Sequence, residues 1–142
     1  MHTLELLPGE LVVVRLPPHT TADDLCALLA TPAQPLASVS RTSDEVSVVC
    51  GEVAWAGMAS LLPLARVERG WRAFRVVGPL PFDAVGILAS ITQPLAAAGV
   101  SLFSLSTFDT DYVLIKSANL GAAEIALAGA GHVWRVPLAV PL

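Results

Sequence analysis

Residues 100–116 read VSLFSLSTFDTDYVLIK, and this stretch carries the pattern that decides the fold. Apolar runs at 100–108 and 112–116 flank a short polar segment that contains Asp109 and Asp111. Two such runs joined by turn-forming residues predict a β-hairpin. Its tip gathers two carboxylates and several hydroxyl groups, which can hold a small cation such as an ammonium group.

The elements around this hairpin complete a β-α-β-β-α-β order. Residues 71–77 alternate as a half-buried strand does, and Gly78 and Pro79 turn the chain. Asp83 is a good N-cap for a helix running to about residue 98, which Pro94 should kink and Gly99 should end. A second helix over about 117–128 and a last strand over 132–136 follow the hairpin. The sequence does not decide whether that strand pairs within its own half.

The first half repeats most of this order. Runs at 3–7 and 11–16 predict a hairpin or two successive strands, and Thr20 or Thr21 begins a helix. Strands at 36–41 and 46–50 follow, joined by a turn, and a weak helix lies within 51–63. We therefore expect an α+β fold in which two ferredoxin-like βαββαβ units, 1–65 and 66–142, pack into one compact body.

Composition narrows the classes of partner. Eight basic and twelve acidic residues give a net charge of −4, and the lack of a basic cluster argues against nucleic acid. Residues 84–108 carry no charge, yet Pro94 and Gly99 divide them into a helix and a strand rather than a membrane span. The start of the chain lacks the pattern of a signal peptide, so we expect a cytoplasmic protein.

No pattern of catalytic or metal-binding residues stands out. Cys26 and Cys50 could pair, but the interpretation we favour is two buried, reduced thiols. The three histidines are scattered, so we expect no metal, no cofactor and no catalysis. An enzyme would need His132 within bonding reach of Ser106 or Cys50.

The helix start and the hairpin tip together suggest a site for a zwitterion. The first amides of a helix bind anions, and Gly86 either lets a ligand approach the backbone or is a small residue under a packed strand. Asp111 opens a strand and suits an ammonium group, whereas Asp109 is better explained as a turn residue. A zwitterion fits only if the fold brings these two segments together.

Several motifs resemble the C-terminal unit of the CASTOR arginine sensors and small bacterial ACT-domain proteins. The motifs are Gly70-Trp71-Arg72, Gly78-Pro79-Leu80 and the stretches 82–88, 94–101 and 106–112. Residues 38–50 also resemble the N-terminal unit of the bacterial proteins. The resemblance implies that both segments, 1–65 and 66–142, are ACT units, a ferredoxin-like module that binds amino acids between paired units and regulates another activity.

The resemblance also implies the residues of an amino-acid pocket. Carried over by motif position, these are Gly86, Thr107, Phe108 and Asp111, with Val85 and Ile87 beside the glycine and an opposite wall at Ser40, Arg41 and Thr42. The CASTOR sensors have four such units and this chain has two, so a homodimer is expected. We thus expect a non-catalytic amino-acid sensor that acts on a regulated protein partner. The alternative is an assembly subunit whose pocket is vestigial.

Overall fold

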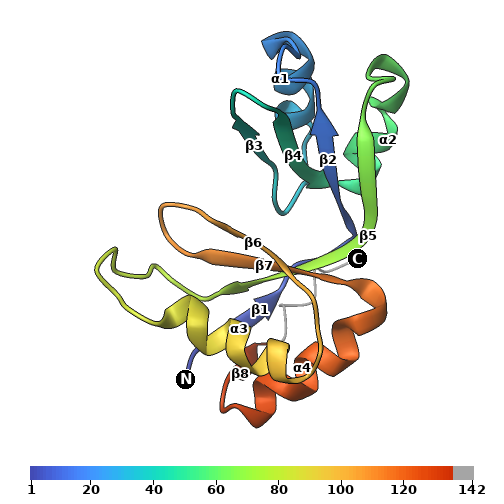
Figure 1. Ribbon diagram of the computed structural model, residues 1–142. Coiled ribbons are helices and arrows are strands. Elements are labelled where there is room, and N and C mark those ends of the chain that lie inside the picture. Colours follow the sequence, from blue (N-terminus) through green and yellow to red (C-terminus); the bar gives the residue numbers. More distant parts are fainter. Residues whose placement is uncertain (136–142) are drawn as a thin grey trace. The chain divides into compact units, whose positions relative to one another are not determined.

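The chain is divided into two units, and the division is not the contiguous one expected from the sequence. The computed structural model describes residues 1–135 (Figure 1). Unit 2 comprises Gly9–Trp71, whereas unit 1 combines Met1–Pro8 with the chain from Arg72 onward. Residues 1–8, which the sequence grouped with the first half, therefore belong with the second half.

Unit 2 has the complete βαββαβ order. Its elements are β2 (Leu11–Leu16), α1 (Ala22–Ala30), β3 (Ser38–Arg41), β4 (Val46–Gly51), α2 (Glu52–Ala56), the 3-10 helix η1 (Ala59–Leu61) and the first part of β5 (Arg66–Val76). The strands pair in the order β3-β4-β2-β5, with all neighbours antiparallel. Valine-rich runs form β2 and β4, whose buried side chains pack with Leu28 and Trp55 in one core.

Unit 1 has the same order with one added strand. After β5 come α3 (Ile87–Ala97), β6 (Phe103–Ser106), β7 (Asp111–Lys116), the 3-10 helix η2 (Ser117–Asn119), α4 (Leu120–Gly129) and β8 (Val133–Arg135). The added strand β1 (Thr3–Leu6) lies between β5 and β8, antiparallel to the first and parallel to the second. The last strand thus pairs within its own unit, through β1; Val136, which we assigned to it, lies outside the described residues.

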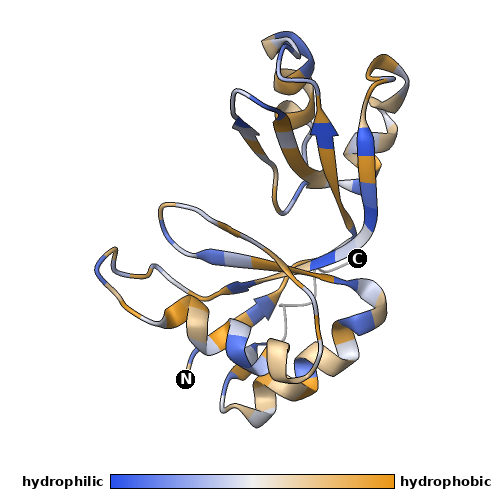
Figure 2. Ribbon diagram, viewed as in Figure 1, coloured by the Kyte–Doolittle hydropathy of each residue, from blue (hydrophilic) through white to orange (hydrophobic). Residues whose placement is uncertain are grey.

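The core of unit 1 explains why β1 belongs there. Leu4 is fully buried together with side chains of β5, α3, β7 and α4, among them Phe74, Ile91 and Leu127. Helices α3 and α4 contribute Ile91 and Leu127 because their apolar positions recur at helical spacing, and Figure 2 shows both helices with few hydrophilic residues. Residues 84–108 form α3 and β6 as expected. Within residues 1–135, no helix is long and apolar enough to cross a bilayer.

The structure decides one open alternative and corrects one expectation at this level. Residues 3–16 form two successive strands rather than a hairpin, because β1 and β2 both run antiparallel to successive parts of β5. Cys26 is exposed on α1 rather than buried, whereas Cys50 is fully buried in β4. Both cysteines are free thiols, and burial raises the pKa of Cys50 to about 11, which makes this thiol unreactive.

Candidate functional site

The first element of the site is the start of α3. The helix begins at Ile87, four residues later than Asp83, because Gly86 occupies the N-cap position with a left-handed φ of 83°. The amide of Ser90 donates to the Gly86 carbonyl at 3.0 Å, which closes the first turn. The preceding amides, of residues 87–89, find no acceptor within residues 1–135 and are the unsatisfied donors of a helix start.

The structure excludes one of the two explanations of Gly86. A Cβ built on this residue would meet no atom within 4 Å. The glycine is therefore not a small residue beneath a packed strand. It is needed because its backbone lies in the left-handed region, and it leaves the helix start open.

The second element is the tip of the β6–β7 hairpin. Ser106 and Asp111 are the last paired residues before the turn, and the Ser106 hydroxyl donates to the Asp111 carboxylate at 2.5 Å. The Thr107 amide donates to the Thr110 carbonyl at 2.9 Å, which closes the turn. Thr107 rather than the Asp109 side chain makes this closing contact. The carboxylate of Asp111 is half-buried and fixed in direction by Ser106.

Two hydrogen bonds hold the hairpin against the segment that leads to α3. The Thr110 hydroxyl, which is buried, donates to the Val76 carbonyl at 2.5 Å. The amide of Leu80 donates to the Asp109 carbonyl at 2.7 Å. A Cβ on Gly78 would lie 2.9 Å from that same carbonyl oxygen, so glycine is required for this close approach.

These contacts create a pocket of about 380 Å³ within unit 1. Its lining comes from residues 80–89 and from the hairpin tip at 106–111, so it contains both elements. Of the expected site residues it includes Gly86, Ile87, Thr107, Phe108 and Asp111. The helix start and the Asp111 carboxylate therefore face one shared hollow, which is the geometric condition for a zwitterion site.

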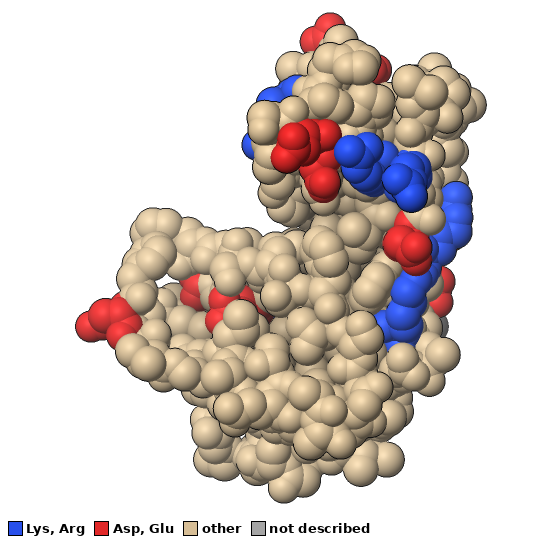
Figure 3. Space-filling model, in the orientation of Figure 1, with Lys and Arg blue, Asp and Glu red and all other residues tan. Residues whose placement is uncertain are grey.

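Charge in the pocket is one-sided. Among the described residues, Asp109 and Asp111 are the only charged ones in its lining. Figure 3 shows acidic side chains in the hollow between the hairpin and the loop before α3, with no basic side chain beside them on this face. The positive end of α3 and these two carboxylates thus offer one place for an anion and one for a cation.

The mouth of the pocket is aromatic. Phe82 and Phe108 both line it, with ring centroids 4.7 Å apart in an edge-to-face arrangement. They are 77% and 80% exposed, and Val85, which does not line the pocket, is 96% exposed on the same loop. Two exposed aromatic side chains therefore line the pocket, and an exposed valine lies in the same loop as Phe82.

The expected opposite wall lies in unit 2. Ser40 and Arg41 end strand β3, and Thr42 begins the turn that follows. None of the three lines the pocket of unit 1. Their role as a complementary wall stays a prediction.

Among the described residues, the hydrogen-bond partners of His132 are not the ones that the enzyme alternative requires. His132 accepts a hydrogen bond from the His2 amide through Nδ1 at 3.1 Å, and its Nε2 lies 2.9 Å from the Ser90 carbonyl. Its ring therefore links His2, which precedes β1, with α3, and its hydrogen bonds go to neither Ser106 nor Cys50. Within the described chain, no group of three or more histidine, cysteine or acidic side chains could hold a metal ion.

Sequence reasoning missed part of the lining. The loop before α3 folds back onto the hairpin, and it therefore adds Leu80, Pro81 and Phe82 to the pocket lining. This fold-back could not be predicted from a local sequence pattern. Ser106 was considered as a nucleophile and as part of a matching motif, but its contact with Asp111 was not predicted. Its register position opposite Asp111 was the available signal, since residues facing each other across a hairpin point to the same side.

Comparison with known proteins finds similarity to ACT domains. A family model described as an ACT domain matches residues 66–128, which contain every lining residue of the pocket. The human cytosolic arginine sensor for mTORC1 subunit 1 is 45% identical over 53 residues, which are 37% of this chain and 16% of the sensor. The chain thus matches only a small part of that longer relative.

Two solved structures extend the likeness to nearly the whole chain. Protein Atu0741 from Agobacterium tumefaciens is 30% identical with a TM-score of 0.81, over 99% of this chain and 97% of that one. The ligand-free regulatory subunit of aspartate kinase from Thermus thermophilus has a TM-score of 0.66 at 15% identity, over 89% of this chain and 96% of that one. At that identity the second likeness shows the fold alone.

Proposed function

Because this chain belongs to the ACT-domain family, we propose that it is a non-catalytic regulatory protein that binds a free amino acid in the pocket of unit 1. One observation carries the proposal. The amide-lined start of α3 and the Asp111 carboxylate border the same hollow of about 380 Å³. An α-amino acid is the small metabolite that presents a carboxylate and an ammonium group together.

The proposed pose follows from the charges. The ligand carboxylate accepts hydrogen bonds from the amides at the start of α3, where the helix dipole adds roughly 0.3–1 kcal/mol. The ammonium group pairs with Asp111, and the carbonyls of Thr107 and Phe108 complete its shell. Gly86 lets the carboxylate approach the backbone, while Val85 and Ile87 flank it. The ligand side chain then lies toward the Phe82–Phe108 pair, and arginine is the first ligand to test because the matched human protein is an arginine sensor.

The proposal includes a homodimer and a regulated protein. Ser40, Arg41 and Thr42 would contribute the second wall of the ligand site in that assembly. Ligand binding would favour one packing of the units, and the shift in population would be read by the partner protein. Molar mass measured by light scattering, with and without ligand, tests the dimer.

The decisive experiment is a thermal-shift screen against the twenty amino acids. We expect at least one to raise the melting temperature of the native chain, since a ligand that binds only the folded state stabilises it. Asp111→Asn should abolish this rise because the amide keeps the shape but not the charge. Asp83→Asn is the matched control, since Asp83 is exposed in the same loop region but does not line the pocket. An undiminished ligand response in Asp111→Asn would reject the assignment.

A second candidate function rests on the uncovered apolar side chains. Phe82, Val85 and Phe108 would suit a protein-interaction subunit whose pocket is vestigial. In that case no amino acid shifts the melting temperature, and Phe82→Ser together with Phe108→Ser weakens the association with a co-purifying protein. A ligand response that depends on Asp111 favours the sensor instead.

A further inference from the structure

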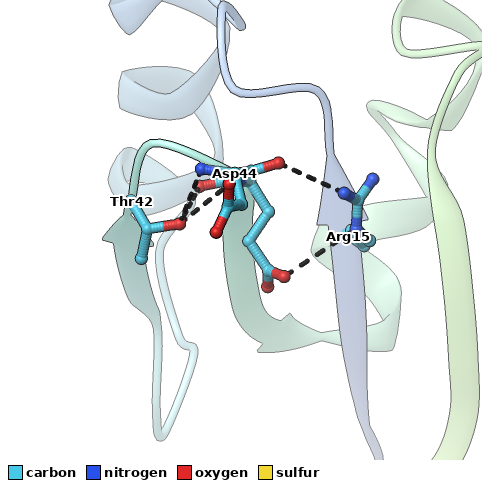
Figure 4. Close-up of polar contacts among 4 residues, drawn as sticks. Arg15, Thr42 and Asp44 are labelled. Atoms are coloured by element: carbon cyan, nitrogen blue, oxygen red, sulfur yellow. Dashed lines mark hydrogen bonds and ion pairs between the residues drawn. The ribbon is translucent and has the colours of Figure 1, made fainter.

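The hairpin turns of the two units have the same closing contacts. In unit 2 the Thr42 amide donates to the Glu45 carbonyl at 2.9 Å and its hydroxyl lies 3.4 Å from that oxygen. In unit 1 the Thr107 amide and hydroxyl contact the Thr110 carbonyl at 2.9 and 3.3 Å. Figure 4 shows the contacts of Thr42 in unit 2. The two turns therefore correspond residue by residue.

The residue pair before each turn differs between the units. The last pair is Ser106 with Asp111 in unit 1, and Arg41 with Val46 in unit 2. Val46 is fully buried in the core of unit 2. The position that carries the pocket carboxylate in unit 1 thus carries an apolar core residue in unit 2. This pair in unit 2 has no group that could receive a ligand ammonium.

Arg41 instead links its hairpin to the loop before the first helix of its own unit. Its guanidinium donates to the carbonyl of Thr20 at 2.6 Å and to the carbonyl of Pro18. Residues 17–21 connect β2 to α1, as residues 77–86 connect β5 to α3 in unit 1. In unit 1 the corresponding two segments border the pocket; in unit 2 a side chain of the protein itself bridges them.

Arg15 strengthens this difference. Its guanidinium donates to the Asp44 carbonyl at 3.2 Å, as Figure 4 shows. Asp44 corresponds to Asp109, whose carbonyl accepts the Leu80 amide from the loop of unit 1. The carbonyl oxygen at this turn position thus accepts a hydrogen bond from a backbone amide of the loop in unit 1 and from an arginine side chain in unit 2. The loop of unit 2 lines a pocket together with residues 61–64 instead, and that lining includes no described residue of the β3–β4 hairpin.

We propose that Arg41 is a built-in occupant of the unit 2 counterpart of the ligand pocket, so that each chain binds a single amino acid, in unit 1. The stoichiometry rests on the proposed function, but the tethering role of Arg41 does not. Arg41 then acts as a positioning residue for the loop before α1. In the expected ligand wall, Arg41 could offer a ligand only those guanidinium N–H groups that do not donate to the carbonyls of Pro18 and Thr20.

The tether is tested without any ligand by hydrogen exchange of the full chain. Arg41→Ala should speed amide exchange about fivefold in residues 18–25, the loss of about one hydrogen bond, and leave residues 106–111 unchanged. Arg66→Ala is the matched control, because Arg66 is also an exposed arginine of unit 2 but lies outside this hairpin. Exchange in residues 18–25 that is the same in Arg41→Ala as in the native chain would overturn the proposal.

The stoichiometry is tested by titration calorimetry with whichever amino acid the thermal screen identifies. We expect one ligand per chain in the native protein and none in Asp111→Asn. Two ligands per chain, or one ligand that still binds in Asp111→Asn, would overturn the proposal. If no amino acid binds the native chain, the proposed function fails while the exchange experiment still decides the role of Arg41.

Discussion

At the scale of single residues, Gly86 is the position where backbone conformation and ligand access coincide. We predict that Gly86→Ala lowers the free energy of unfolding by about 1 kcal/mol, because alanine is strained at a φ of 83° although its Cβ meets open space. Gly121→Ala is the control, since Gly121 lies in α4 with open space around it and no left-handed φ. Urea unfolding of both variants measures the difference. Equal stabilities would mean that the left-handed conformation is not required.

The residue scale is also where the sequence was most and least informative. Asp111 and Gly86 could be selected because charge and glycine are visible in the sequence, and the pocket includes both. The helix start could not be placed, since Asp83 is a better N-cap by residue type than Gly86. A left-handed glycine outweighs that preference only once the loop has folded, as tertiary context often overrides local propensity.

At the scale of elements, the hairpin is docked on the strand β5 and its following loop through Gly78. We predict that Gly78→Ala destabilises unit 1 by about 1–3 kcal/mol, because its Cβ would lie 2.9 Å from the Asp109 carbonyl and must push the two segments apart. The same shift would open the pocket, so any amino-acid response should weaken as well. Gly129→Ala, in α4 of the same unit and with no atom near its Cβ, is the control. Denaturation with and without ligand separates the two effects.

The order of elements followed from the sequence, while their pairing did not. Apolar runs and turn residues gave β5, α3, β6, β7 and α4, since periodicity and glycine or proline positions are local signals. The pairing of β1 with β5 and β8 joins residues more than sixty positions apart. Nothing in residues 3–6 distinguishes a strand of the first half of the chain from a strand of the second half. The boundary expected at residue 65 therefore assigned β1 to the wrong unit.

At the scale of the whole molecule, we predict that two similar core substitutions reduce amide protection in different units. Leu4 and Leu28 are both fully buried, the first in the core of unit 1 and the second in the core of unit 2. Replacement by alanine should cost about 2–5 kcal/mol in each case. Leu4→Ala should therefore reduce amide protection in β7 and α4, far away in sequence, and spare β4. Leu28→Ala should do the reverse.

Hydrogen exchange of both variants measures where each loss falls, because protection reports the stability of each cooperative unit. A contiguous division at residue 65 would place Leu4 with Leu28, and both substitutions would then loosen β4. In the structure, the sequence of unit 2 is instead inserted between the first strand of unit 1 and the remainder of unit 1. If Leu4→Ala reduced amide protection in β4 and left β7 protected, the assignment of β1 to unit 1 would be wrong. The sheet beside the pocket of unit 1 would then lack β1.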